Sequence, residues 1–514
     1  MQRGSFGLDD PAPVPAWRRP GDPRGPIRVR DVMQMSSGLS FTGQDDRHLD
    51  PTTQYHDHFF IYAGAVNAFA YATSSPIEFA PGISGVNAWT FLYLNFMIMP
   101  IVAFLSISQP YVLSEIVGIP ESEQGRITGF LVTMQEVVAL ALISVVGALS
   151  DRVGRRPLFA AGVVIAALGF ALYSTAETEL DLYLYRFIYA IGVSIAGVMI
   201  AVTAADYPAE NSRGKLSGAT GFLNGLGVGV AAGLILPGLP AIFQAQGASA
   251  ADAGRYMLLA MAGLALVTAI VMQAGLKGGT PTGHSRKVSL RKALSVGLSQ
   301  GRENPRLVVC YAGSFVARAD LTLVAVFVSL WLQQVGRNEG LDSAAALKQA
   351  GIMFALITGA SLLWAPVAGI FIDRFHRLAC VCAALLIAGI GYTLLGLQVN
   401  PFGPLGYLGA VLVGIGQMSV ILTVTGLMGQ ETPIDVRGSV IGFASLCGAA
   451  GILATSLAGG YIYDHWMISG PVILTGIANL AVFGFALAVW LKDGRPVRFD
   501  PGEARSSEVL DFGH

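Results

Sequence analysis

Long apolar stretches recur along the chain, and short charged segments separate them. A run of about 20 apolar residues can cross a bilayer as a helix. Twelve such runs are present, at about 89–113, 126–149, 157–175, 181–204, 216–240, 256–275, 307–333, 348–371, 378–397, 404–428, 439–463 and 471–491. This pattern predicts an all-α membrane protein with twelve transmembrane helices.

The composition agrees with a membrane protein. Only 13% of the 514 residues are charged, against about 25% in soluble domains. A net charge of −1 argues against a nucleic-acid partner. The cysteines lie in apolar runs without metal-ligand spacing, so we expect no metal or cofactor; they are Cys310, Cys380, Cys382 and Cys447.

The loops between the runs differ in charge. Cytoplasmic loops carry an excess of Lys and Arg. Fifteen such residues fall on one side, namely Arg152, Arg155, Arg156, Arg213, Lys215, Lys277, Arg286, Lys287, Arg291, Lys292, Arg302, Arg306, Arg374, Arg377 and Arg437. Four fall on the other, namely Arg126, Arg255, Arg337 and Lys348. We therefore expect a multi-pass protein of the cell membrane with both termini in the cytoplasm.

Two pairs of loop segments repeat at nearly the same offset. GALSDRVGRR (147–156) and GIFIDRFHR (369–377) place their aspartates 222 positions apart. YPAENSRGKLSG (207–218) and ETPIDVRGSVIG (431–442) place their Arg-Gly steps 224 positions apart. The similar offsets indicate an internal duplication, a known architecture of secondary transporters.

The aspartate-arginine motif after the second of twelve spans, with a degenerate copy after the eighth, resembles the major facilitator superfamily over residues 87–492. The resemblance implies two pseudo-symmetric six-helix bundles, at 87–275 and 307–492, joined by a cytoplasmic linker (276–306) and followed by a cytoplasmic tail (493–514). A weaker match is Arg186-Phe-Ile-Tyr-Ala-Ile-Gly192 on the fourth span, although small residues at that spacing also serve helix packing.

In this family the motif aspartate reaches a helix start in the opposite half, where free N–H groups stabilise a carboxylate. The resemblance therefore predicts Asp151 near Gly438 and Asp373 near Gly214, as latches of the outward-open state. The other latch residues would be Gly147, Arg152, Gly154, Arg155, Arg156, Gly369, Arg374 and Arg377. The glycines would permit close approach and a tight loop; the arginines equally fit simple topology signalling.

Four ionisable residues lie deep in the predicted spans: Glu136, Arg186, Arg318 and Asp320. Each would cost about 2.5–3.5 kcal/mol at a bilayer centre, so we expect them to face the interior and find partners. Glu136 and Arg186 lie at comparable depths, which predicts an ion pair, direct or through water. Arg318 and Asp320 are two positions apart and should point to different helix faces.

The seventh span contributes to the central cavity in this family. We expect Asp320 to couple protons and Arg318 to bind an anionic substrate group, whereas charges that only lock helices together are an equal alternative. Asn224 and Gln417 would add hydrogen bonds to a substrate or, as the alternative, between helices.

Residues 1–86 have a different character. IRVRDVMQMSSGLSF (27–41) and SPIEFAPG (75–82) resemble serine β-lactamase-like hydrolases. Those enzymes need a Ser-x-x-Lys nucleophile, but no lysine precedes Lys215. We expect a catalytically dead, poorly ordered fragment, from a gene fusion or a misplaced start codon, without a cleavable signal peptide.

These patterns predict a secondary active transporter, not an enzyme, that moves a small solute by alternating access as a functional monomer. Proton coupling and a carboxylate-bearing solute are favoured. A drug efflux antiporter is the alternative, although the fifth span lacks the Gly-Pro signature of drug/proton antiporters. A membrane-anchored hydrolase and a channel are alternatives of other classes. No phosphate-binding Gly-x-x-x-x-Gly-Lys motif is present, so an ion gradient is the expected driver.

Overall fold

The computed structural model describes residues 79, 82–208, 213–278, 290–433 and 436–492. Within these ranges the regular structure is helical, apart from an isolated bridge between Phe79 and Pro208. Twelve helical segments in them are long and apolar enough to cross a membrane. The predicted all-α membrane fold is confirmed. The predicted hydrolase-like fragment and the predicted tail lie almost wholly outside the described residues.

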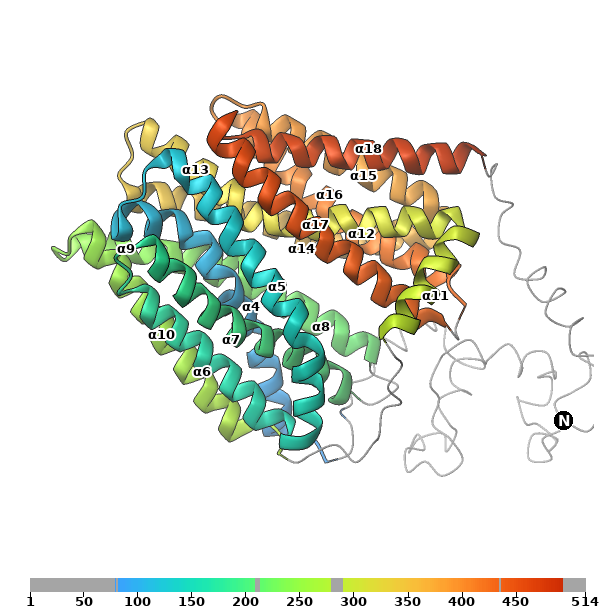
Figure 1. Ribbon diagram of the computed structural model, residues 1–514, viewed down its shortest axis with the longest axis horizontal. Helices are drawn as coiled ribbons and strands as arrows, with labels where there is room; N and C mark the ends of the chain where they lie inside the picture. The colour runs from blue at the N-terminus through green and yellow to red at the C-terminus, as the bar shows by residue number, and fades with distance from the viewer. Residues whose placement is uncertain (1–78, 80–81, 209–212, 279–289, 434–435, 493–514) are drawn as a thin grey trace, which may run out of the picture. The chain divides into compact units, whose positions relative to one another are not determined.

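Helices α4 to α10 form the first six spans (Figure 1). Their bounds are α4 (Gly85–Tyr111), α5 (Glu121–Val153), α6 (Arg155–Tyr173), α7 (Glu179–Asp206), α8 (Arg213–Leu226), α9 (Leu239–Ala245) and α10 (Ala250–Gly275). The first span continues past α4 in wider, π-helical turns over Val112–Val117, and the fifth continues past α8 in similar turns over Gly227–Ile235. Such turns interrupt the regular ladder of i to i−4 hydrogen bonds.

Helices α12 to α18 form the second six spans (Figure 1). Their bounds are α12 (Pro305–Leu323), α13 (Ser329–Asn338), α14 (Ser343–Arg374), α15 (Arg377–Gly396), α16 (Pro404–Glu431), α17 (Arg437–His465) and α18 (Gly470–Lys492). The seventh span has π-helical turns over Val324–Val328, between α12 and α13. In the first span these turns end the segment, whereas in the seventh they lie near its middle, so the irregularities are not at equivalent positions.

The predicted linker contains a helix that the sequence pattern did not reveal. Helix α11 (Leu290–Glu303) packs against α12 and α17. The hydroxyl of Tyr311 donates to the carbonyl of Gly297 at 2.7 Å, and the Gly297 backbone lies close to Phe443. This helix is short and mainly polar, so a search for apolar runs of membrane length passes over it.

Glycines allow close helix packing at equivalent places in both repeats. Between α6 and α7, a Cβ on Gly192 would lie 2.3 Å from the Ala166 nitrogen. Between α15 and α16, a Cβ on Gly416 would lie 2.4 Å from the Ala388 Cα. Small residues let helix backbones approach closely in a membrane, where packing replaces the hydrophobic effect as the driving force.

The described residues fall into two compact units. Trp89–Ile200 and the residues from Phe222 onward form the larger unit, whereas Ala201–Gly221 belong to the other. All contacts described below lie within the larger unit. We use the term inner end for the side of the spans that carries the aspartate-arginine loops, and outer end for the opposite side.

Candidate functional site

Arg186 of α7 is buried in the N-terminal half, with 1% of its surface exposed. Its guanidinium donates to Ser106 Oγ at 3.1 Å and to Gln109 Oε1 at 3.3 Å, both on α4. It also lies over the ring of Tyr189, 5.3 Å from the centroid. Among the described contacts, Arg186 forms no direct ion pair with Glu136, so the prediction of a direct pair is wrong. Comparable depth in the membrane does not determine which helix face a side chain occupies.

Glu136 of α5 is half-buried, and Arg318 of α12 is the charged residue near enough to favour the ionised form of its carboxyl group. The two residues come from different halves of the molecule. Arg318 is exposed, and its stem packs against Gly448 of α17, where an added Cβ would lie 2.5 Å from Arg318 Cγ. Gly448 thus leaves the space that the arginine side chain occupies.

A cavity of about 410 Å³ opens beside Arg318 in the C-terminal half. Helices α12, α16 and α17 line it, and Arg437 at the start of α17 is its second cation. Its hydroxyl-bearing lining residues are Ser314, Thr425 and Ser445. None of its described lining residues is acidic. The hydroxyls of Thr425 and Ser445 donate to carbonyls of their own helices, so the two guanidinium groups are the main donors of the cavity, and they suit an anionic ligand.

Asp320 points away from this cavity, as its spacing from Arg318 predicts. Its side chain is fully buried, and Asn479 of α18 donates to both carboxylate oxygens, at 3.0 and 3.2 Å. The hydroxyl of Tyr392 approaches the Asp320 carbonyl and Gln417 Oε1, each at 3.3 Å. Asp320 and Gln417 thus belong to one buried polar cluster between α12, α15, α16 and α18.

Asn224 of α8 is half-buried, and its Oδ1 is a buried acceptor without a hydrogen-bond partner among the described residues. A buried carbonyl oxygen without a donor is costly. Asn224 is therefore free to accept from a ligand. The hydrogen bonds of Gln417, in contrast, agree with the interhelical alternative.

The predicted latch motifs lie at the inner ends of α5 and α14. Gly154 has φ of 95°, and its N–H bonds the Ser150 carbonyl at 3.0 Å, which confirms the predicted tight loop. Arg156 and Arg377 donate to the carbonyls of Leu276 and Gly426. Arg152 and Arg374 are exposed, and Arg155 is half-buried.

The contacts predicted for the latch aspartates involve residues that the structure describes only in part. The side chains of Asp151 and Asp373, and the surroundings of Gly214, lie outside the described part of the structure. No described atom lies within 4 Å of the place that a Cβ would take on Gly147, Gly369 or Gly438. The predicted contacts therefore stay predictions.

At the outer end, in contrast, α5 and α17 touch backbone to backbone. A Cβ on Gly129 would lie 2.3 Å from the Ser456 carbonyl oxygen, and one on Gly460 would lie 2.5 Å from that of Gly125. The Asp464 carboxylate accepts the N–H groups of Gly125 at 2.8 Å and Arg126 at 2.6 Å. We call this set of residues, Gly125, Arg126, Gly129, Ser456, Gly460 and Asp464, the outer contact.

Two hydrogen bonds also join α5 to α13 at the outer end. Glu121 of α5 accepts from Gln334 at 2.9 Å and Arg337 at 3.2 Å, both on α13. These contacts were not predicted from the sequence. Small residues at i and i+4, Gly125 with Gly129 and Ser456 with Gly460, were a usable signal, since this spacing marks close helix pairs in membranes.

Comparisons with known proteins cover most of the chain. Residues 87–346 and 310–513 match the family described as Major Facilitator Superfamily. The chain is 28% identical over 429 residues to the magnetosome protein MamZ of Magnetospirillum gryphiswaldense, covering 81% of this chain and 63% of MamZ. It is 26% identical to the magnetosome protein MamH of Paramagnetospirillum magneticum, covering 82% of this chain and 96% of MamH.

A solved structure shares the fold. The crystal structure of the nucleoside transporter NupG superimposes with a TM-score of 0.61 at 13% identity, covering 79% of this chain and 99% of NupG. The chain spans under two thirds of the length of MamZ. The hydrolase resemblance of residues 1–86 has no support from these matches.

Proposed function

The chain belongs to the major facilitator superfamily, and from this premise we propose that it is a secondary active transporter of a small, carboxylate-bearing solute. The observation that carries the proposal is the cavity beside Arg318, which presents two arginines and, among its described lining residues, no acidic side chain. An arginine binds a carboxylate through two parallel hydrogen bonds, so it selects for this group over neutral solutes.

Transport would proceed by alternating access between the two halves. The outer contact joins α5 and α17 at one end, while no described atom approaches Gly147 or Gly438 at the other end. We infer from this pattern a carrier closed on its outer side, in which Arg318 would be reached from the inner side. Rocking of the halves would break the outer contact and form the predicted latch of Asp151 with the start of α17.

We assign the binding and coupling roles as follows. In the empty carrier, the Glu136 carboxylate would balance the charge of Arg318. Uptake of a proton by Glu136 would free the Arg318 guanidinium for the substrate carboxylate. One proton and one carboxylate would then move together, which leaves the number of charges in the membrane unchanged. Asn224 would add a hydrogen bond.

Asp320 is the second candidate for the proton, because a fully buried carboxylate that accepts, among the described residues, from an amide group alone is poorly compensated as an anion. Its route to the substrate would run along α12 to Arg318. We also propose a monomer in the cell membrane with both termini in the cytoplasm, on the basis of the charge difference between the loops.

Uptake by proteoliposomes tests the proposal. Labelled carboxylates, sugars, amino acids and cationic drugs would be supplied with and without a pH gradient, and both directions would be measured. We expect uptake of a carboxylate that Arg318→Gln reduces at least about tenfold, the effect of losing about 1.4 kcal/mol. Arg255→Gln is the matched control, because Arg255 pairs with Asp252 outside the cavity. Normal carboxylate uptake by Arg318→Gln would contradict the proposal.

The proton donor is tested in the same vesicles. Glu136→Gln mimics the protonated state, so we expect tight carboxylate binding that no longer depends on pH. Asp320→Asn should keep the pH dependence if Glu136 is the site. Loss of pH dependence in Asp320→Asn alone would assign the proton to Asp320, and its retention in both variants would rule out both residues.

A further inference from the structure

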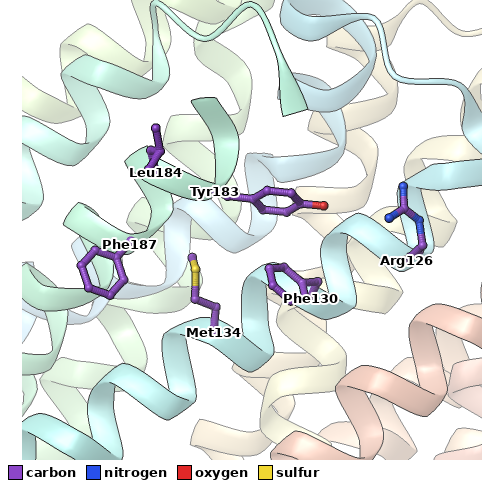
Figure 2. Close-up of a pocket in the computed structure, with 6 residues that line it drawn as sticks. All are labelled: Arg126, Phe130, Met134, Tyr183, Leu184 and Phe187. Carbon is purple, nitrogen blue, oxygen red and sulfur yellow. The ribbon is translucent and has the colours of Figure 1, made fainter. Parts of the chain in front are cut away.

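A groove separate from the substrate cavity runs between α5 and α7 near the outer end. It encloses about 610 Å³ and is lined by Arg126, Phe130, Met134, Tyr183, Leu184 and Phe187. Figure 2 shows Arg126 at one end, with the Tyr183 hydroxyl directed toward it, Phe130 in the middle, and Met134, Leu184 and Phe187 on the far side from the arginine. The groove therefore has one charged end and one apolar end.

The apolar end has the dimensions of a lipid chain. Arg126, Phe130 and Met134 are spaced by four residues on one face of α5, which spans about 12 Å of helix. One leaflet contributes about 15 Å of hydrocarbon. Phe130, Leu184 and Phe187 are 47%, 53% and 46% exposed. These side chains face the membrane, and the groove between α5 and α7 runs among them, so an acyl chain fits along the groove.

The charged end of the groove carries both positive and negative side chains. Arg126 Nη2 lies 3.6 Å from the Glu123 carboxylate and 3.4 Å from that of Glu179. The Tyr183 hydroxyl also donates to Glu179. The guanidinium has five N–H donors, and both contacts use one nitrogen, so donors remain for a further anion. The two carboxylates in turn suit a cation that donates hydrogen bonds.

A zwitterionic head group with a primary ammonium matches this arrangement. We propose that the groove binds one phosphatidylethanolamine molecule of the outer leaflet, with an acyl chain along Phe130 to Phe187. The phosphate accepts from Arg126, and the ammonium donates to Glu123 and Glu179. Phosphatidylcholine has the same charges but no N–H donors, and phosphatidylglycerol has no cation, so the site discriminates against both.

Native mass spectrometry of the detergent-purified full-length chain tests this inference. Dioleoyl-phosphatidylethanolamine, -phosphatidylcholine and -phosphatidylglycerol would be titrated separately and the fraction with one lipid bound measured. We expect phosphatidylethanolamine to bind about fivefold more tightly than either of the others, equivalent to about 1 kcal/mol. Equal binding of all three lipids would overturn the proposal and indicate nonspecific annular contact, and tighter binding of phosphatidylglycerol would overturn the ammonium assignment.

Three variants identify the site. Arg126→Gln should weaken binding of every phospholipid, Glu179→Gln should remove the preference for phosphatidylethanolamine over phosphatidylcholine, and Leu184→Trp should fill the groove. Arg255→Gln removes another, partly exposed arginine of the outer end and should leave lipid binding unchanged. The proposal is overturned if Arg126→Gln and Leu184→Trp both bind phosphatidylethanolamine as tightly as Arg255→Gln does.

Discussion

Charged residues that are close in the sequence of this molecule lie on different faces of a helix and therefore in different surroundings. Arg318 and Asp320 are neighbours in sequence, yet Arg318 faces a cavity while Asp320 is fully buried with Asn479. Rotation of about 100° per residue separates them, so α12 presents one residue to the cavity and one to the interior of the C-terminal half. Under the proposed function, the same helix would serve both binding and packing.

Replacement of Asp320 would show what the buried cluster contributes to stability. Asp320→Ala removes the acceptor of two contacts from Asn479 Nδ2 and leaves space between α12 and α18. We expect a loss of about 1–3 kcal/mol, the usual effect of stranding a buried donor. Asp320→Asn keeps the shape and should lose less. Thermal unfolding in detergent measures both, and equal losses in the two variants would contradict the role of hydrogen bonding.

His376 predicts a pH effect on stability. It lies between α14 and α15, where burial and the positive charge of Arg306 lower its pKa below 6.5, against the opposing effect of Glu431. The neutral form therefore suits the folded state. Its contribution to stability is complete above pH 6.5 and is lost as the pH falls from 6.5 toward the lower pKa of the folded protein.

His376→Gln should remove this part of the pH dependence. We expect the variant to lose less stability than the parent chain between pH 7 and pH 5, measured by thermal unfolding at each pH. His465, at the outer end of α17, offers a control substitution to Gln, since it is exposed. Identical pH profiles for His376→Gln and the parent would contradict the effect.

At the scale of elements, α5 and α17 form the close helix pair at the outer end, on which closure would depend. Gly129 has no room for a side chain, because the Ser456 carbonyl lies 2.3 Å from the place of a Cβ. Gly129→Val should destabilise the outer-closed state by about 1–3 kcal/mol, the usual effect of overpacking. Carriers that expose their outer side would become more frequent.

Labelling of an introduced cysteine at Ser456 by a membrane-impermeant maleimide would measure this shift. We expect faster labelling when Gly129→Val is present. Gly263→Val is the control, because Gly263 on α10 is exposed with no described atom within 4 Å of an added Cβ. Equal labelling rates for Gly129→Val and Gly263→Val would show that the outer contact does not limit access.

The elements follow from the sequence far better than their contacts do. Apolar runs identified all twelve spans, because each span must bury its backbone in hydrocarbon. Neither helix α11 nor the hydrogen-bond partners of Arg186 were predicted from the sequence. Both depend on which face packs against which neighbour, and a mainly apolar span has little polar face to reveal this. The repeated loop motifs indicated the internal duplication, which hydropathy alone does not show.

For the whole molecule, the proposed transport cycle would place one aspartate at each end, each acting in one of two states. Asp464 accepts two backbone N–H groups at the start of α5, and the family resemblance predicts that Asp151 meets the start of α17 at the other end. Each carboxylate would stabilise one conformation only. Hydrogen bonds to charged groups contribute about 1.5–3 kcal/mol, so loss of one aspartate should shift the populations tenfold or more.

The two substitutions should therefore act in opposite directions. Asp464→Asn should favour carriers open to the outside, and Asp151→Lys should favour carriers open to the inside, while both proteins insert normally. Each shift slows transport, because the cycle needs both states. The double variant should recover a balanced population, although both of its states are less stable. Cysteine accessibility at Ser456 and at Gly438 would follow the two ends separately. If the effects on the populations add in the same direction, or if Asp151→Lys leaves uptake kinetics unchanged, the paired-latch mechanism is wrong.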